Sequence, residues 1–246
     1  MDTDSHPIVV GFDSSPPAVN AVRWAVAEAV ARDVPLRLTR VLGEGTPPAD
    51  LDATRRALAE AGDALVAQSP NLRVQTCATR GGVADVLLAQ SHAAAMICVG
   101  SDGYCVGRPL GALATTLARH AGCDVAVIKD CPDSPTTDPG VVAVVLDDEA
   151  DDDERVHQAM REGRLRHTSV RQIDRRADSW VRRYPDVHVE TVAAGTGFPA
   201  PGSPDRRPPQ LAVVGRGDAE QLADLATPNC HPIVGFPDCS VLVVRR

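Results

Sequence analysis

Short apolar runs and longer stretches of helical spacing alternate along the first half of the chain. Residues 7–13 form an almost continuous apolar run that ends at Asp13, and such a run is typical of a buried strand. Ser14 or Ser15 can cap the helix that follows, and the apolar residues within 22–29 recur at helical spacing. The pattern therefore predicts a strand, a cap and a helix, which together make a βα unit.

The same alternation continues to residue 129. We expect further strands at 35–42, 72–79, 95–99 and 124–129, and further helices at about 49–68, 83–91 and 112–121. Strands and helices that alternate in this way form a parallel sheet with helices on both faces, because right-handed crossovers return the chain to the same sheet. The first half is therefore predicted to be an α/β domain.

The second half of the chain repeats the first. The run at 96–100 returns at 211–215, the run at 123–129 returns at 239–245, and the run at 74–81 returns at 188–195, so that the offsets are 115, 116 and 114. The opening strands, 7–13 and 141–147, lie further apart than this. Three such similar offsets predict a duplicated domain, whose second copy is about 19 residues shorter between its first and third strands.

These boundaries predict a first domain at 1–130, a linker at 131–140 and a second domain at 141–246. The linker contains three prolines and has no periodicity, as is typical of connecting segments. In the second copy, the proline-rich segment 197–209 stands where the first copy has its helix at 83–91. Because proline cannot continue a helix, we expect a loop there and a degenerate second domain.

Composition narrows the class of protein. The chain has 246 residues, of which 43% are hydrophobic and 3% aromatic, and a net charge of −8. An acidic surface repels phosphates, which argues against broad nucleic-acid binding or anionic-membrane binding. No apolar run approaches the length of a membrane span, so we expect a cytoplasmic protein. The seven cysteines are odd in number and include no CxxC pair, so neither a disulfide framework nor a zinc ribbon is indicated.

Residues that could bind a ligand lie at the ends of two strands that we expect to be buried. Asp13 follows the first strand, and Gly100 and Gly103 begin the loop after the strand at 95–99. In open parallel sheets the carboxyl ends of the strands bind ligands where the strand order reverses. Glycines there let backbone N–H groups approach a phosphate, and the helix near Ala112 directs its positive end at an anion. A merely flexible glycine loop explains the same residues, and the spacing alone leaves both interpretations open.

Two stretches of the first half, 10–29 and 97–128, resemble the universal stress proteins, in the tandem two-domain form found in actinobacteria. The similarity covers residues 7–130 and, more faintly, 141–246. It implies two flavodoxin-like domains of the adenine nucleotide alpha hydrolase-like class. It also implies ATP, with Mg²⁺, as the cofactor of the first domain.

In the nucleotide-binding branch of that family, an Asp after the first strand and a backbone position in the second strand hold the adenosine. A G-x2-G-x9-G-[S/T] loop wraps the phosphates. Carried over to this chain, the resemblance implies that the nucleotide-binding residues are Gly11, Phe12, Asp13, Val41, Gly100, Gly103, Gly111, Ala112 and Leu113.

The chain departs from the family pattern at two points. Seven residues rather than nine separate Gly103 from Gly111, and Ala112 stands in place of Ser or Thr. Loss of one hydroxyl contact to a phosphate costs about 1–3 kcal/mol. In the second copy Gly215 is retained and is followed by Arg, Gly and Asp, but the G-x2-G spacing and the later glycine are absent. Asp218 would repel a phosphate, so we expect no nucleotide there.

Two further clusters each allow two interpretations. The acidic run 147–154 could hold a divalent cation, but it is better explained as a solvated loop whose last acids favour a helix N-terminus. The arginines around Trp180 and Tyr184 could stack on RNA, but an amphipathic helix that packs both aromatic rings on the sheet fits the acidic chain better. No Ser-His-Asp, HExxH or paired-carboxylate pattern is present, so no catalytic residue is predicted.

The favoured hypothesis is a non-catalytic regulatory protein of stress or dormancy that binds ATP in its first domain and acts through a signalling partner. The alternative is a nucleotide-free scaffold that acts only through protein–protein interaction, and an enzyme is a distant third. The two domains are expected to form an internal pseudo-dimer. A homodimer through the terminal strands 124–129 and 240–245 is left open.

Overall fold

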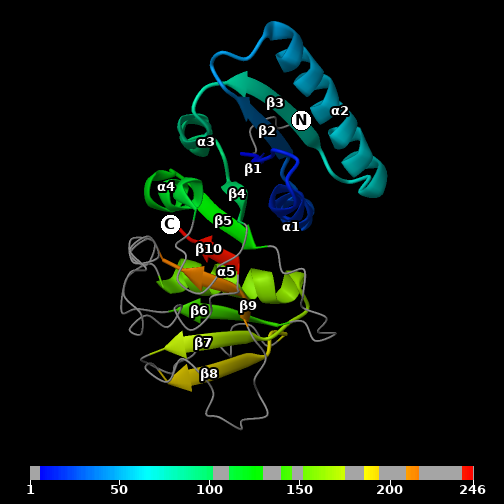
Figure 1. Cartoon of the computed structure of the whole chain (residues 1–246). Coiled ribbons are helices and arrows are strands. Elements are labelled where there is room, and N and C mark those ends of the chain that lie inside the picture. Colours follow the sequence, from blue (N-terminus) through cyan, green and yellow to red (C-terminus); the bar gives the residue numbers. More distant parts are fainter. Residues whose placement is uncertain are drawn as a thin grey trace. The chain divides into compact units, whose positions relative to one another are not determined.

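The computed structural model describes residues 6–101, 111–129, 140–145, 152–174, 186–193, 209–215 and 240–245 (Figure 1). These residues fall into two compact units. The first unit contains strands β1–β5 and the second contains strands β6–β10. The limits of the two domains and of the linker at 131–140 stay a prediction.

The first unit alternates strands and helices as the sequence pattern predicts. Its strands are β1 (Ile8–Gly11), β2 (Leu36–Leu42), β3 (Val74–Arg80), β4 (Met96–Ser101) and β5 (Asp124–Lys129). Its helices are α1 (Pro16–Arg32), α2 (Pro48–Gln68), α3 (Val83–Ser91) and α4 (Ala112–His120). All strand pairs are parallel and give the order β3-β2-β1-β4-β5. The predicted α/β fold is confirmed, and most elements begin and end close to the expected positions.

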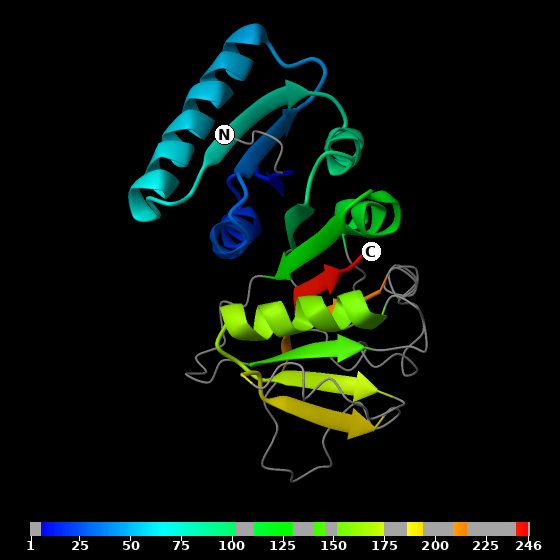
Figure 2. The same ribbon diagram turned by 180° about the vertical axis from the view of Figure 1, so that it is seen from behind.

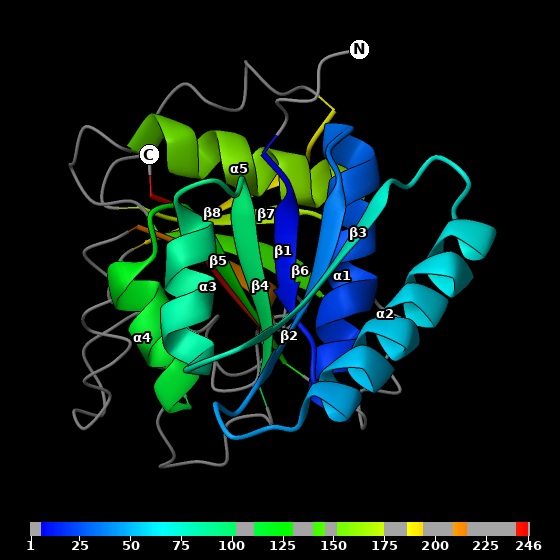
Figure 3. The same ribbon diagram turned by 90° about the horizontal axis from the view of Figure 1, so that it is seen from above.

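Helices cover both faces of this sheet. Seen from above, α1 and α2 lie on one side of the strands and α3 and α4 on the other (Figure 3). This division follows from right-handed crossovers, because the chain runs outward in one direction from β1 to β3 and then returns to β4 and β5. The sheet is therefore buried in its centre, where the side chains of β1 and β4 such as Val9, Val10, Met96 and Ile97 are fully buried.

Helix α2 contributes little to the core. Of its 21 residues, only Leu58 and Gly62 are buried. The helix lies along β3 at the edge of the sheet (Figure 2), and a methyl group added at Gly62 would lie 3.1 Å from Cγ1 of Val74. A small residue at this position therefore lets the helix approach the edge strand closely.

The second unit has the same strand topology. Its elements are β6 (Val141–Val145), α5 (Asp152–Leu165), β7 (Val170–Asp174), β8 (Val189–Ala193), β9 (Pro209–Val214) and β10 (Ser240–Val243). The parallel pairs give the order β8-β7-β6-β9-β10, which matches the first unit strand for strand. The fold class of two flavodoxin-like units is confirmed.

Equivalent hydrogen bonds show the duplication residue by residue. The N–H of Val34 donates to the carbonyl of Ala29 at 3.0 Å, and the N–H of Thr168 donates to the carbonyl of Gly163 at 2.9 Å. Each helix is followed by a residue with φ of 51°, Asp33 after α1 and His167 after α5. These pairs share the larger offset that relates the two opening strands, 7–13 and 141–147.

The predicted offset of the third strand was wrong by one position. Leu36 of β2 pairs with Val74 of β3, and its counterpart Val170 of β7 pairs with Val189 of β8. Val74 therefore corresponds to Val189 and not to His188. The physical reason is register, because a slip of one position would send every side chain of the strand to the other face of the sheet.

Each unit has an ion pair at the end of its first helix, and the carboxylate of each pair is buried. The Glu28 carboxylate lies 3.2 Å from Nε of Arg32, and the Glu162 carboxylate lies 2.8 Å from an Nη of Arg166. The Glu162 carboxylate also accepts a hydrogen bond of 2.7 Å from Gln158. Glu28 is 2% exposed and Glu162 is fully buried. The two pairs occupy equivalent positions, since the offset that relates Asp33 to His167 also relates Glu28 to Glu162.

Some expectations fall on other parts of the chain. The loop that contains Gly103, the linker from 131, the helix around Trp180 and the proline-rich segment up to residue 208 all lie outside the described residues.

Candidate functional site

The candidate site lies at the carboxyl ends of the strands of the first unit. The chain leaves β1 for β2 on one side, while β4 pairs with β1 on its other side. The strand order therefore reverses between β1 and β4. In parallel sheets the crossovers diverge at such a point and leave a crevice above the strand ends.

The described candidate residues all reach this rim. Gly11 ends β1 and is followed by Phe12 and Asp13. Val41 is the penultimate residue of β2, and Gly100 is the penultimate residue of β4. The start of α4 is formed by Gly111, Ala112 and Leu113. Gly103 lies outside the described residues. The fold therefore brings these residues to one edge of the sheet, whereas the sequence pattern could only assign them to separate strands and helices.

Asp13 is held at the rim by the turn into α1. Its carboxylate accepts a hydrogen bond of 2.9 Å from the N–H of Ser15, after Ser14 with a positive φ of 69°. The Ser15 hydroxyl donates to the carboxylate and lowers the pKa of Asp13, and the charge of Arg40 lowers it further. Asp13 is exposed. The rim therefore presents an ionised carboxylate, which can accept hydrogen bonds from ligand hydroxyl groups.

Gly100 is required by packing alone. A methyl group added there would lie 2.2 Å from the carbonyl carbon of Pro17, 2.3 Å from its oxygen and 2.7 Å from the N atom of Ala18. All three atoms belong to the backbone of the first turn of α1. Glycine is thus the residue that lets the end of β4 meet this helix, whatever else occurs at the rim.

Within the part of the chain that the structure describes, no side chain caps the N-terminus of α4. Gly111 is the N-cap residue, and it is exposed together with Ala112. The Thr116 hydroxyl donates to the carbonyl of Ala112 at 2.8 Å, so it is turned back onto its own helix. An uncapped helix start carries N–H donors and the positive end of the helix dipole, which together favour an anion.

A buried polar chain behind the rim was missed by sequence reasoning. Thr39 in the middle of β2 is 1% exposed, and its hydroxyl donates to the side-chain oxygen of Gln90 in α3 at 2.9 Å. The carbonyl of Thr39 accepts the N–H of Phe12 at 2.9 Å. These two hydrogen bonds connect Phe12, at the end of β1, to β2, and β2 to α3. The sequence offered little signal for this contact, because Thr39 alternates along β2 with Arg37, while Leu36 and Leu38 lie on the other face of the strand.

The corresponding rim of the second unit is built differently. A methyl group added at Gly215, which follows β9, would lie 3.0 Å from the guanidinium carbon of Arg155. The Arg155 side chain belongs to α5 and is 1% exposed. A buried cationic side chain thus packs against the glycine that corresponds to Gly100.

The described residues offer neither a metal-binding cluster nor a membrane-spanning helix. The described part of the chain contains no group of three or more His, Cys, Asp and Glu side chains that could hold a metal ion. Within the same described ranges, no helix is long and apolar enough to cross a membrane.

The chain is similar to known universal stress proteins. A family model described as the universal stress protein family matches residues 5–129. A curated universal stress protein from Mycobacterium tuberculosis is 38% identical over 263 residues, which cover 97% of this chain and 96% of that protein. Both copies of the duplicated domain are therefore included in the similarity.

Solved structures agree on the fold. The crystal structure of a universal stress protein from Archaeoglobus fulgidus covers 98% of this chain and 99% of that chain, at 12% identity and a TM-score of 0.63. A universal stress protein family protein from Arabidopsis thaliana, solved with AMP bound, covers 54% of this chain at a TM-score of 0.38. A likeness at that lower level does not extend the ligand to this chain.

Proposed function

Since this chain belongs to the universal stress protein family, we propose that it is a regulatory protein of stress or dormancy that binds ATP at the carboxyl rim of its first unit. Binding, rather than turnover, is the activity that we assign to the site. The protein then acts in the cytoplasm by presenting its nucleotide state to a signalling partner.

The rim geometry supports nucleotide binding. One observation carries the proposal. The ionised carboxylate of Asp13 and the start of α4 lie at the same edge of the sheet, beside the point where the strand order reverses. A nucleotide has hydroxyl donors at its ribose and negative charge at its phosphates, which matches this pair of features. The Asp13 carboxylate would accept from the ribose and the helix start would face the phosphates.

Turnover is not part of the proposal. The sequence contains no Walker-type Gly-Lys-Ser/Thr motif, and phosphoryl transfer depends on positioned cations and on a base or polar group that orients water. We therefore expect hydrolysis to be slow or absent. The alternative function is a nucleotide-free scaffold, and the observation that favours it is the start of α4, where Ala112 carries no hydroxyl and that of Thr116 is engaged.

Calorimetry with ATP and Mg²⁺ on nucleotide-stripped protein tests the proposal. We compare the natural chain with Asp13→Asn, which keeps an oxygen to accept from Ser15 but removes the charge. The control is Asp63→Asn, because Asp63 is an exposed acid on α2. A dissociation constant in the micromolar range, roughly tenfold weaker in Asp13→Asn alone, supports the proposal.

Two results would contradict it. Absence of heat at about 1 mM ATP would establish the scaffold instead. Equal affinities for all three proteins would place any bound nucleotide away from the Asp13 rim.

A further inference from the structure

Two arginines, which we call the rim arginines, lie near the carboxyl ends of β2 and β3 in the first unit. Arg40 is the third residue from the end of β2, and Arg80 is the last residue of β3. In the register of these strands, Arg40 pairs with Ala78 and Leu42 pairs with Arg80. Because side chains alternate between the two faces of a sheet, the rim arginines lie on the same face, with Cα atoms about 8 Å apart. Long side chains can approach each other over that distance.

This face is the one that α1 and α2 cover. A methyl group added at Gly62 of α2 would lie 3.1 Å from Val74 and 3.6 Å from Thr76, and these two residues share a face of β3 with Arg80. Helix α1 lies on the same side of the sheet as α2 (Figure 3). The rim arginines therefore lie on the side where both helices begin, close to the turn from β1 into α1.

Neither guanidinium is bound by an acceptor in the part of the chain that the structure describes. The Nε atom of Arg80 is buried and has no hydrogen-bond partner there. Within the same ranges, the Arg40 side chain makes no hydrogen bond or ion pair. Both residues are half-buried. A buried donor that lacks an acceptor is costly, and a bound ion is one of the few ways to satisfy it.

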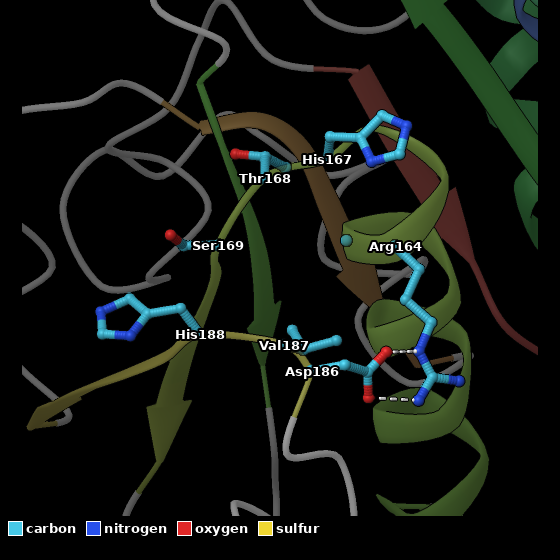
Figure 4. A pocket seen from close by; sticks show the side chains of 8 residues that line it. Arg164, His167, Thr168, Ser169, Asp186, Val187 and His188 are labelled. Atoms are coloured by element: carbon cyan, nitrogen blue, oxygen red, sulfur yellow. Dashed lines mark hydrogen bonds and ion pairs between the residues drawn. The ribbon is translucent and has the colours of Figure 1, made fainter.

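Other arginines show how this fold satisfies a guanidinium group. On the same two strands, Nε and an Nη of Arg37 donate to Oε1 of Gln75 at 3.0 and 2.8 Å. In the second unit, both oxygens of Asp186 accept hydrogen bonds from Arg164, beside a pocket of about 550 Å³ (Figure 4). The donors of the rim arginines, in contrast, remain available to a ligand.

The neighbouring carboxylates do not neutralise the rim arginines. Asp13 is close enough for the charge of Arg40 to lower its pKa, but its carboxylate is held by Ser15. Oε1 of Glu44 lies 3.9 Å from the position of a methyl group added at Gly81, and among the described residues it forms no ion pair with either rim arginine. Two like charges this close repel each other, and an anion between them removes the repulsion.

The second copy lacks both cations. The strand registers of the two units carry Arg40 to Asp174 and Arg80 to Gly195 in the sequence. The second unit has the same strand order without them, so the topology does not depend on a guanidinium at either position. The rim arginines are therefore specific to the unit that holds the candidate nucleotide residues.

We propose that the rim arginines bind the phosphate group of a small ligand, on the other side of Asp13 from the start of α4. A guanidinium offers planar N–H donors that match phosphate oxygens in pairs. Two guanidinium charges balance a phosphate ester, which carries nearly two negative charges near neutral pH, better than they balance a singly charged carboxylate. The phosphate is either a free ion or a second phosphate on the ribose of a nucleotide, and only the latter rests on the function proposed above.

NMR of the full chain with inorganic phosphate tests the site without any nucleotide. Titration to about 20 mM at about pH 7.5 should shift the Nε–H signal of Arg80 and the amide signals of residues 40–42 and 79–81, with a dissociation constant in the low millimolar range or tighter. Acetate, titrated in parallel, should bind more weakly because it carries a single charge.

Charge-removing variants assign the binding to the rim arginines. Arg40→Gln and Arg80→Gln should each weaken phosphate binding about tenfold. Arg80→Lys keeps the charge but not the planar fork, so its affinity should lie between those of Arg80→Gln and the natural chain. The matched control is Arg56→Gln, which makes the same change at an exposed arginine of α2. Circular dichroism confirms that each variant is folded.

Three nucleotides distinguish the two sources of the phosphate group. AMP carries one phosphate, whereas 2′,5′-ADP and 3′,5′-ADP carry a second one on the ribose. If the ligand is such a nucleotide, one of the two should bind about tenfold more tightly than AMP, and Arg80→Gln should abolish the difference. Equal affinities, together with binding of inorganic phosphate, assign the site to the free ion. If ATP fails to bind but inorganic phosphate binds here, the proposed function is wrong and this site stands.

Three results would overturn the proposal. Neither inorganic phosphate nor a ribose-phosphorylated nucleotide shifts the signals of residues 40–42 and 79–81. The shifts are confined to residues 111–113, which would place the anion at the start of α4. Both Arg40→Gln and Arg80→Gln bind phosphate as tightly as Arg56→Gln does.

Discussion

Replacing Gly100 by alanine separates the structural role of this residue from any role in ligand binding. The added methyl group would lie 2.2 Å and 2.3 Å from the carbonyl atoms of Pro17 and 2.7 Å from the N atom of Ala18. Contacts this short with backbone atoms cannot be relieved by rotating a side chain. Either α1 or β4 must move, and β4 is fixed on both sides by β1 and β5.

The size of the effect follows from this lack of freedom. Overpacking a well-filled core costs typically about 1–3 kcal/mol, and a clash with the backbone of both α1 residues belongs at the upper end or beyond. We expect Gly100→Ala to lower the free energy of unfolding of the first unit by about 3 kcal/mol or more. With a urea slope of about 1.5 kcal/mol/M, the midpoint should fall by roughly 2 M.

Gly111→Ala is the matched control. A methyl group added at Gly111 has no atom of the described residues within 4 Å, and the φ of −52° at Gly111 suits alanine. We expect a change within about 1 kcal/mol of the natural chain. Trp24, in α1, reports on the first unit in a Trp180→Phe background. If Gly100→Ala unfolds within about 1 kcal/mol of the Gly111→Ala variant, the close approach of β4 and α1 is refuted.

Two further predictions concern charged groups. Glu162→Ala removes the buried carboxylate that accepts hydrogen bonds from both Gln158 and Arg166. In urea unfolding it should lower the free energy of unfolding of the second unit by about 3 kcal/mol. A loss as small as that of the exposed control Glu60→Ala would show that the pair is not buried in solution. Carboxyl NMR should find the pKa of Asp13 below its ordinary value of 3.8, and Ser15→Ala should raise it, because the Ser15 hydroxyl is the largest cause of the lowering. Since the folded-state pKa lies below the unfolded one, this contact stabilises the fold above about pH 4 and is lost as pH falls through the folded-state pKa; an unchanged pKa in Ser15→Ala would contradict the assignment.

Local patterns were sufficient to predict most elements. The apolar runs at 7–13 and 95–99, together with the cap at Ser14 or Ser15 and the helical spacing within 22–29, predict β1, β4 and α1 to within a few positions. They do so because buried strands and amphipathic helices have characteristic patterns of apolar residues along the sequence. The duplication was visible for the same reason, since both copies must fill the same kind of core.

Contacts between distant segments could not be predicted in the same way. The glycine at 100 was interpreted as a flexible loop or a phosphate cradle, yet its observed constraint comes from Pro17, which lies on the first helix of the unit, far earlier in the chain. Similarly, the error of one position in the third offset reflects a register that only strand pairing determines. Thr39 and Gln90 are in contact because β2 and α3 pack together in the fold. The hydrophobic periodicity of the sequence does not indicate this contact.

The candidate nucleotide residues form an intermediate case. The sequence placed Asp13 and the start of α4 at strand and helix ends, and the parallel topology then brings them to one rim. The equivalence of Asp33 and His167 was not predicted, because it appears only when the two copies are compared across the offset of their opening strands.

The two units join their second and third strands by crossovers of different length. The segment 43–73, which includes α2, joins β2 to β3, whereas the segment 175–188, which joins β7 to β8, is less than half as long. Both units nevertheless have the same strand order and the same register at this pair. Crossover length at this point is therefore not what specifies the topology, so the segment that holds α2 is the natural place to splice a tag or reporter into the chain.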